Sequence, residues 1–162
     1  MQSRPTTLLL DTNLLMLLFI GGKDTSLIAR AKTLSAFSVE DYDLLIDIIR
    51  NNAFVRLITT PHIMTEVSNL LGRERSPIRE IGRKAMAEFM DKCVERTDDS
   101  AYLVSNPVFE RLGLTDVAIT VAAEQPAFVL TADVDLYIHM SRLGLPTENF
   151  NHIRQGSWES SP

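Results

Sequence analysis

Three short apolar runs, each followed by a segment with strong helix signals, most constrain how this chain can fold. The runs cover residues 7–10, 54–59 and 127–130, and each has the length of a buried strand rather than of a helix. Strands that alternate with helices pair in parallel through right-handed crossovers. The pattern therefore predicts an α/β domain with a central parallel sheet flanked by helices.

Caps and breakers mark the helices between these runs. Ser38-Val-Glu-Asp has the character of a capping box, and Thr60 followed by Pro61 supplies an N-cap with proline at the first helical position. We expect Gly72 to end that helix, Thr115 to cap the helix at residue 116, and Gly144 to end the last helix. Helices are predicted over residues 13–20, 39–49, 61–71, 77–94, 107–112, 116–124 and 133–143, with a further short strand over residues 101–104.

Length and charge limit the classes of partner. The 162 residues suit a single domain, which we expect over residues 1–154, with a polar and mobile tail over residues 155–162. Sixteen Lys and Arg against twenty-one Asp and Glu give a net charge of −5, so no overall basic field attracts nucleic acid or an anionic membrane. Any phosphate-bearing substrate must be held locally.

The first apolar stretch and the single cysteine indicate the compartment. Asp11 and Asn13 interrupt the stretch near the N-terminus, which argues against a signal peptide or a membrane span. Cys93 alone can form neither an intramolecular disulfide nor a structural zinc site. The expected location is the reducing cytoplasm.

Acidic residues follow the predicted strands, at the sheet edge where open parallel sheets bind ligands. Asp11 follows the run at residues 7–10, and Asp133 and Asp135 follow the run at residues 127–130. Asp116 lies at the first position of its predicted helix, where the helix dipole favours an acid, so a capping role alone would explain it.

Glu66 is harder to explain by structure alone. It shares a helical stripe with Ile63, Val67 and Leu70, which is predicted to pack on the sheet. A buried carboxylate needs a cation, a hydrogen-bond network or a position at the edge of the core. Several acids at one edge also raise one another's pKa unless a positive charge neutralises them. Since only oxygen ligands are available, the predicted cofactor is Mg²⁺ or Mn²⁺.

Four segments resemble the PIN domain family over nearly the whole chain: LLLDTNLL, TPHIMTEVSNLLG, GLTDVAITVAAE and VLTADVDL. The resemblance implies a small α/β domain with a parallel sheet and an acidic cluster that binds Mg²⁺ or Mn²⁺. It also implies ribonuclease activity, and many members are toxins of bacterial toxin–antitoxin pairs. The family's four acidic positions fall on Asp11, Glu66, Asp116 and Asp133, and its polar supporting positions fall on Asn13 and Thr131.

These residues predict metal-assisted hydrolysis of phosphodiester bonds in single-stranded RNA. Asp11 and Asp116 are the expected principal ligands, and Glu66 and Asp133 would complete the site directly or through water. Asp135 is a further candidate ligand in the last motif. Asn13 and Thr131 are expected to orient carboxylates or the attacking water.

The substrate-binding residues and partners are less constrained. Basic residues concentrate around Arg73, Arg75 and Arg79, which are candidates for phosphate contacts, although a solvated helix face explains them as well. Helices added to the compact toxin pattern would serve an antitoxin, another partner or a substrate, and a homodimer is expected. The alternatives are a non-catalytic PIN-like module that binds protein or RNA, and a DNA-directed nuclease, which the lack of a basic stripe disfavours.

Overall fold

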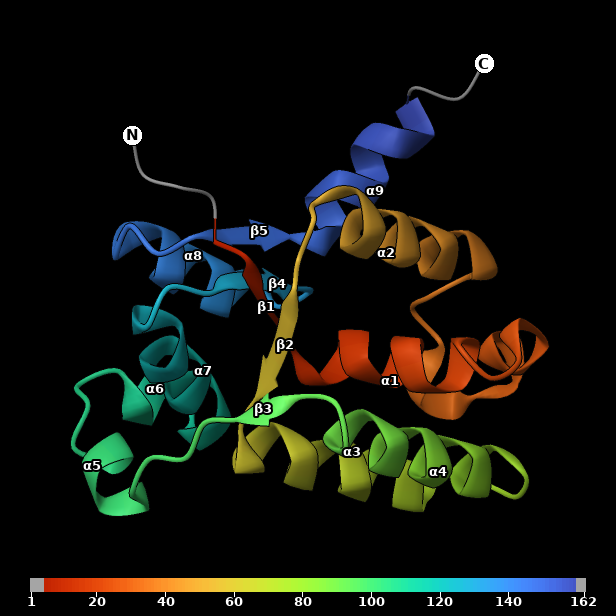
Figure 1. The fold of residues 1–162 in the computed structure, drawn as a ribbon, viewed down its shortest axis with the longest axis horizontal. Helices are drawn as coiled ribbons and strands as arrows, with labels where there is room; N and C mark the ends of the chain where they lie inside the picture. Colours follow the sequence, from red (N-terminus) through yellow and green to blue (C-terminus); the bar gives the residue numbers. More distant parts are fainter. Residues whose placement is uncertain (1–4, 160–162) are drawn as a thin grey trace.

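The structure, a computed structural model, describes residues 5–159, and its centre is one parallel sheet. The strands follow the order β3-β2-β1-β4-β5. Their bounds are β1 Thr7–Leu10, β2 Arg56–Thr59, β3 Val94–Glu95, β4 Phe128–Thr131 and β5 Thr147–Asn149. Helices cover the sheet, which confirms the predicted α/β class (Figure 1).

The middle strand is buried on both faces. Leu8, Leu9 and Leu10 are each at most 2% exposed. Leu9 pairs with Ile58 of β2 on one side and with Val129 of β4 on the other. A strand covered on both faces has a continuous apolar run rather than an alternating one, which is why this segment reads so clearly as a strand.

Helices α1, α3 and α4 form one packed group, with α2 also against α1 (Figure 1). Helices α5 and α6 pack on α7 and form a smaller apolar cluster around Leu103 and Val117. The helix bounds are α1 Thr12–Gly21, α2 Val39–Asn51, α3 Pro61–Arg73, α4 Ile78–Met90, α5 Ser100–Val104, α6 Phe109–Leu112, α7 Leu114–Glu124, α8 Val134–Arg142 and α9 Phe150–Glu159. Two 3-10 helices, η1 Thr25–Arg30 and η2 Lys32–Leu34, connect α1 to α2.

Two predicted helix starts are confirmed in detail. The Ser38 side chain accepts a hydrogen bond from the backbone N–H of Asp41, whose carboxylate accepts one from the Ser38 N–H, so α2 begins with a capping box. Thr60 Oγ1 accepts a hydrogen bond from the N–H of Ile63, and Pro61 is the first residue of α3.

The prediction of a strand at residues 101–104 is wrong, because these residues lie in α5. Only Leu103 of this segment is buried, and such a short run does not distinguish a helix from a strand by its pattern. The chain instead forms the edge strand β3 at Val94–Glu95, where the predicted helix over residues 77–94 was expected to end.

Several helix boundaries also differ from the predicted ones. Helix α3 continues through Gly72 to Arg73, and α7 begins at Leu114 because Gly113, with a φ of 84°, turns the chain there. Thr115 is therefore inside the helix and is not its cap. Past Gly144, the structure has β5 and α9, neither of which was predicted.

The predicted tail at residues 155–162 is only partly covered by the structure. Residues 155–159 continue α9, and residues 160–162 lie outside the described residues. Among the helices described here, none combines the length and apolar character needed to cross a bilayer.

Gly82 allows α3 and α4 to approach closely. A Cβ atom there would lie 2.2 Å from Cδ2 of Leu71, which is fully buried. At the exposed Gly72, the nearest atom to such a Cβ is Arg83 Nη2 at 3.8 Å, so Gly72→Ala is a matched control. We expect Gly82→Ala to be less stable than Gly72→Ala by about 1–3 kcal/mol in denaturant unfolding, because overpacking costs that much. Equal stability of the two variants would contradict this close packing.

Candidate metal centre

Asp11 ends β1 and caps α1, and its carboxylate is held in a fixed orientation. Oδ1 accepts a hydrogen bond from the N–H of Leu14 at 3.0 Å. Oδ2 accepts one from Thr131 Oγ1 at 2.5 Å and one from the N–H of Ala132 at 2.7 Å. Burial raises the pKa of Asp11, the three hydrogen bonds lower it, and the charge of Asp133 raises it again.

Thr131, the last residue of β4, connects Asp11 to Asp133. Its hydroxyl donates to Asp11 and accepts a hydrogen bond from the N–H of Asp133 at 2.9 Å. Asp133 caps α8, and its Oδ1 accepts a hydrogen bond from the N–H of Leu136 at 3.0 Å. The carboxyl ends of β1 and β4 therefore place two acids next to each other, with one threonine between them.

Glu66 does not pack on the sheet, and it instead takes the other arrangement that the sequence left open, a hydrogen-bond network at the edge of the core. Ile63 and Val67 are fully buried, but α3 turns Glu66 to an exposed position. Its Oε2 accepts a hydrogen bond from Thr12 Oγ1 at 2.9 Å, and its Oε1 accepts one from Thr115 Oγ1 at 2.6 Å. Glu66 thus lies at the edge of the core in a hydrogen-bond network between α1, α3 and α7.

Asp116 lies in the first turn of α7 and is half-buried. Burial raises its pKa to about 7, with further contributions from the charges of Asp133, Glu66, Asp11 and Asp135, in that order. The helix dipole alone would favour the charged form, so the raised pKa shows that desolvation and the neighbouring acids dominate. The other four predicted acids therefore all lie within electrostatic reach of Asp116.

The other two predicted residues of this region are exposed. Asp135 lies in the first turn of α8, where its charge acts on Asp116. Asn13 lies in the first turn of α1, and its side chain forms no hydrogen bond with any residue that the structure describes. The structure therefore gives Asn13 no contact with a carboxylate.

The acids form an electrostatic cluster rather than a closed set of ligands. Within residues 5–159, no three Asp, Glu, His or Cys side chains have the arrangement of a preformed metal site. The Asp116 carboxylate accepts no hydrogen bond from the described residues, so its lone pairs are available to a ligand. Mg²⁺ binds through one or two carboxylates and retains several waters, and the oxygen-only donors here fit that mode.

The basic residues singled out from the sequence lie away from these acids. Arg73 ends α3, seven residues beyond Glu66, or about 10 Å along the helix. Arg75 lies in the connection to α4, and Arg79 pairs with Glu80 at 3.0 Å. The structure does not bring Arg73, Arg75 or Arg79 to the acidic cluster.

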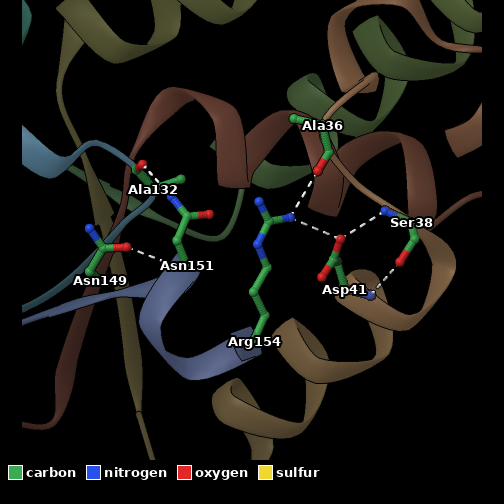
Figure 2. Close-up of polar contacts among 7 residues, drawn as sticks. All are labelled: Ala36, Ser38, Asp41, Ala132, Asn149, Asn151 and Arg154. Carbon is green, nitrogen blue, oxygen red and sulfur yellow. Dashed lines mark hydrogen bonds and ion pairs between the residues drawn. The ribbon is translucent and has the colours of Figure 1, made fainter. Parts of the chain in front are cut away.

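Helix α9 supports the other side of the segment that holds Asp11 (Figure 2). The amide Nδ2 of Asn151 donates to the carbonyl of Ala132 at 2.9 Å, while the N–H of Ala132 donates to Asp11. Arg154 donates to the carbonyl of Ala36 at 2.8 Å and to Asp41 Oδ2 at 3.2 Å. The last helix therefore joins the start of α2 to the peptide behind the acidic cluster.

Sequence reasoning missed three residues of this arrangement. Thr12 and Thr115 hold Glu66, and their positions directly before Asn13 and Asp116 in the quoted motifs were a usable signal. Asn151 had no local signal, because its role depends on how α9 docks.

Compared with known proteins, the chain matches no family model and no curated protein sequence. The fold and the arrangement of the acidic residues therefore carry the functional argument.

The raised pKa of Asp116 predicts how stability depends on pH without metal. The folded chain binds a proton at Asp116 up to pH about 7, whereas the ordinary value is 3.8. The stabilisation from this proton is thus present below pH 3.8 and is lost as the pH rises through about 7. In EDTA, we expect the thermal midpoint of the wild type to fall over this range more steeply than that of Asp116→Asn. The exposed Asp47→Asn serves as control, and parallel curves for wild type and Asp116→Asn would contradict the assignment.

Thr131 provides a second prediction, because its hydroxyl is buried and makes two hydrogen bonds. Thr131→Val keeps the shape but removes both, and we expect it to lower the free energy of unfolding by about 1–3 kcal/mol. Thr131→Ser keeps the hydroxyl and loses one methyl group, at a cost of about 1 kcal/mol or less. Urea unfolding of both variants tests this, and an equal loss in both would assign the effect to the methyl group.

Proposed function

We propose that this chain is a Mg²⁺- or Mn²⁺-dependent endoribonuclease of the PIN-domain type. The observation that carries the proposal is Asp116, a half-buried carboxylate whose pKa is raised to about 7 by burial and by four neighbouring acids. A structure that gathers this much negative charge at the ligand-binding edge of a parallel sheet is stabilised by a bound divalent cation.

Asp11 and Asp116 are the proposed direct ligands, and Glu66 and Asp133 contribute directly or through water. When bound, the ion polarises the phosphodiester, activates a water and stabilises the leaving oxygen. Thr131 and the N–H of Ala132 fix the direction of Asp11, and two threonines hold Glu66. Asp135 adds negative charge at the outer side of the cluster.

RNA as substrate rests on the resemblance of the four acidic motifs to PIN domains. The same resemblance supports a cytoplasmic toxin with an antitoxin partner, and a homodimer. Compared with the compact toxin pattern, the stretch between Gly21 and Ala53 and the helix from Ser76 onward are longer. They contain η1, η2, α2 and α4, which supply surface for such a partner.

One observation favours a second candidate function. Because the described acids do not form a preformed set of metal ligands, a non-catalytic module that binds RNA or protein also agrees with the geometry. This module would need neither the metal nor the carboxylate of Asp116.

Cleavage and metal binding together separate the two candidates. Single-stranded RNA and DNA are incubated with the wild type, Asp11→Asn, Asp116→Asn and the control Asp47→Asn, in Mg²⁺, Mn²⁺ or EDTA. We expect metal-dependent RNA cleavage that falls about 100-fold or more in Asp11→Asn and Asp116→Asn, beyond the 10- to 100-fold typical of residues that only support a ligand. Asp47→Asn should cleave like the wild type.

Mn²⁺ binding by calorimetry provides the second readout. We expect Asp116→Asn to lose this binding while remaining folded. Mn²⁺ binding without cleavage would overturn the nuclease and leave a metal site. Absence of both cleavage and Mn²⁺ binding would favour the binding module. Cleavage of DNA but not of RNA would identify DNA as the substrate.

A further inference from the structure

Three hydrogen bonds in series lead from Asn151 of α9 to the carboxylate of Asp11. Asn151 Nδ2 donates to the carbonyl oxygen of Ala132 at 2.9 Å (Figure 2). That carbonyl belongs to the same peptide group as the N–H of Asp133, which donates to Thr131 Oγ1 at 2.9 Å. The Thr131 hydroxyl then donates to Asp11 Oδ2 at 2.5 Å. We call these three bonds the asparagine relay.

The chemistry of the groups fixes the direction of each bond in the asparagine relay. A carbonyl oxygen only accepts, so the part of the Asn151 amide that faces Ala132 is the NH₂ group. A backbone N–H only donates, so Thr131 Oγ1 accepts from Asp133, and its one hydrogen is directed at Asp11. Each bond strengthens the next, because a group that accepts a hydrogen bond becomes a better donor.

The asparagine relay lies largely away from water. Thr131 is fully buried, Asp11 is 6% exposed and Asn151 is half-buried. Hydrogen bonds are electrostatically stronger in such surroundings than in water, and chains of them polarise one another. Removal of the first donor therefore weakens the last bond, the one that Asp11 accepts.

Other residues dock α9, so Asn151 is not needed to hold the helix in place. Phe150 is fully buried, and its ring centre lies 6.3 Å from that of Phe37. Arg154 lies three residues after Asn151, on the same face of the helix. It donates to Asp41 Oδ2, and its Cζ lies 5.4 Å from the centre of the Phe37 ring (Figure 2). These contacts fix the helix at the distance from which the Asn151 amide reaches the cluster.

The carbonyl of Ala132 does not by itself require a side-chain donor. Ala132 is half-buried, and a water molecule satisfies a carbonyl nearly as well as a direct bond. A side chain on a docked helix adds a fixed direction. Ala132 is held from both ends, because its N–H donates to Asp11 at 2.7 Å while its carbonyl accepts from Asn151.

We propose that Asn151 is a positioning residue for the metal ligand Asp11, and that it acts through the asparagine relay. The part that concerns metal rests on the proposed function, whereas the orientation of Asp11 does not. Partners that orient a metal ligand change metal affinity about 10- to 100-fold. Asn151 thus connects the docking of the last helix to the direction of a carboxylate at the end of the first strand.

Amide hydrogen exchange in the metal-free protein tests the relay without metal or activity. Asn151→Leu keeps the branched shape of the side chain and removes its donor, and Gln155→Leu at an exposed position of α9 is the matched control. We expect the N–H groups of Ala132 and Asp133 to exchange about 3- to 10-fold faster in Asn151→Leu, the effect of one lost hydrogen bond. Both groups should exchange at the wild-type rate in Gln155→Leu.

The buried N–H of Ile63, which is outside the relay, reports on general stability. It should exchange at the wild-type rate in both variants. Equal acceleration at Ile63, Ala132 and Asp133 in Asn151→Leu would show a general loss of stability and overturn the relay. Unchanged exchange at Ala132 and Asp133 would overturn it as well.

Mn²⁺ binding by calorimetry tests whether the effect passes through the Thr131 hydroxyl. We expect Asn151→Leu to weaken Mn²⁺ binding about 10-fold in the wild-type background. In the Thr131→Val background, the same change should weaken binding by about 2-fold or less, because only the direct bond from the Ala132 N–H remains. Equal losses in both backgrounds, or an unchanged affinity of Asn151→Leu, would overturn the proposal.

These results separate this inference from the proposed function. A wild type that neither binds Mn²⁺ nor cleaves RNA, with faster exchange at Ala132 and Asp133 in Asn151→Leu, overturns the metal centre and retains the positioning of Asp11. Metal-dependent cleavage, with exchange and Mn²⁺ affinity indifferent to Asn151, retains the nuclease and overturns the relay.

Discussion

The carboxylate of Asp11, buried at the end of the central strand, is the group on which the rest of the structure depends. It caps α1 through Leu14 and accepts two hydrogen bonds from the end of β4, so it fixes both the helix that follows β1 and the strand beside it. A buried carboxylate needs such partners, because an unpaired one costs several kcal/mol. The same three hydrogen bonds leave the acid with one orientation at the edge of the sheet, where the other acids gather.

The negative charges of the acidic cluster lower the stability of the fold. Only Asp11 and Asp133 have their charges satisfied by backbone caps, and Glu66 relies on two threonine hydroxyls. Asp116 has no such partner among the described residues, and burial together with the charges of the neighbouring acids raises its pKa. Strongly shifted acids concentrate at functional sites, because a fold without a ligand gains nothing from keeping them.

The sequence predicts those parts of the molecule whose cause is local. The leucines of β1, the caps at Ser38 and Thr60, and the acids after β1 and β4 follow from apolar pattern and capping chemistry. The strand predicted at residues 101–104 was wrong, and β5 was not predicted. Both are short segments at the edges of the domain, and packing determines their structure. The exposure of Glu66 and the contact of Asn151 with Ala132 depend on how helices dock, which no local pattern encodes. Metal binding and RNA cleavage stay predictions.

The residues on β4 and α9 that hold Asp11 lie far from it along the chain, and this separation delays the formation of the site during synthesis. Thr131 is 120 residues from Asp11, and Asn151 comes later still. At about 5–20 residues per second, a ribosome delivers Thr131 about 6–24 seconds after Asp11. Throughout that interval, β1 lacks one of its two neighbouring strands, and Asp11 lacks two of its three donors. A growing chain therefore carries Asp11, Glu66 and Asp116 without the arrangement that couples them, and the site forms only after the end of β4 has been synthesised.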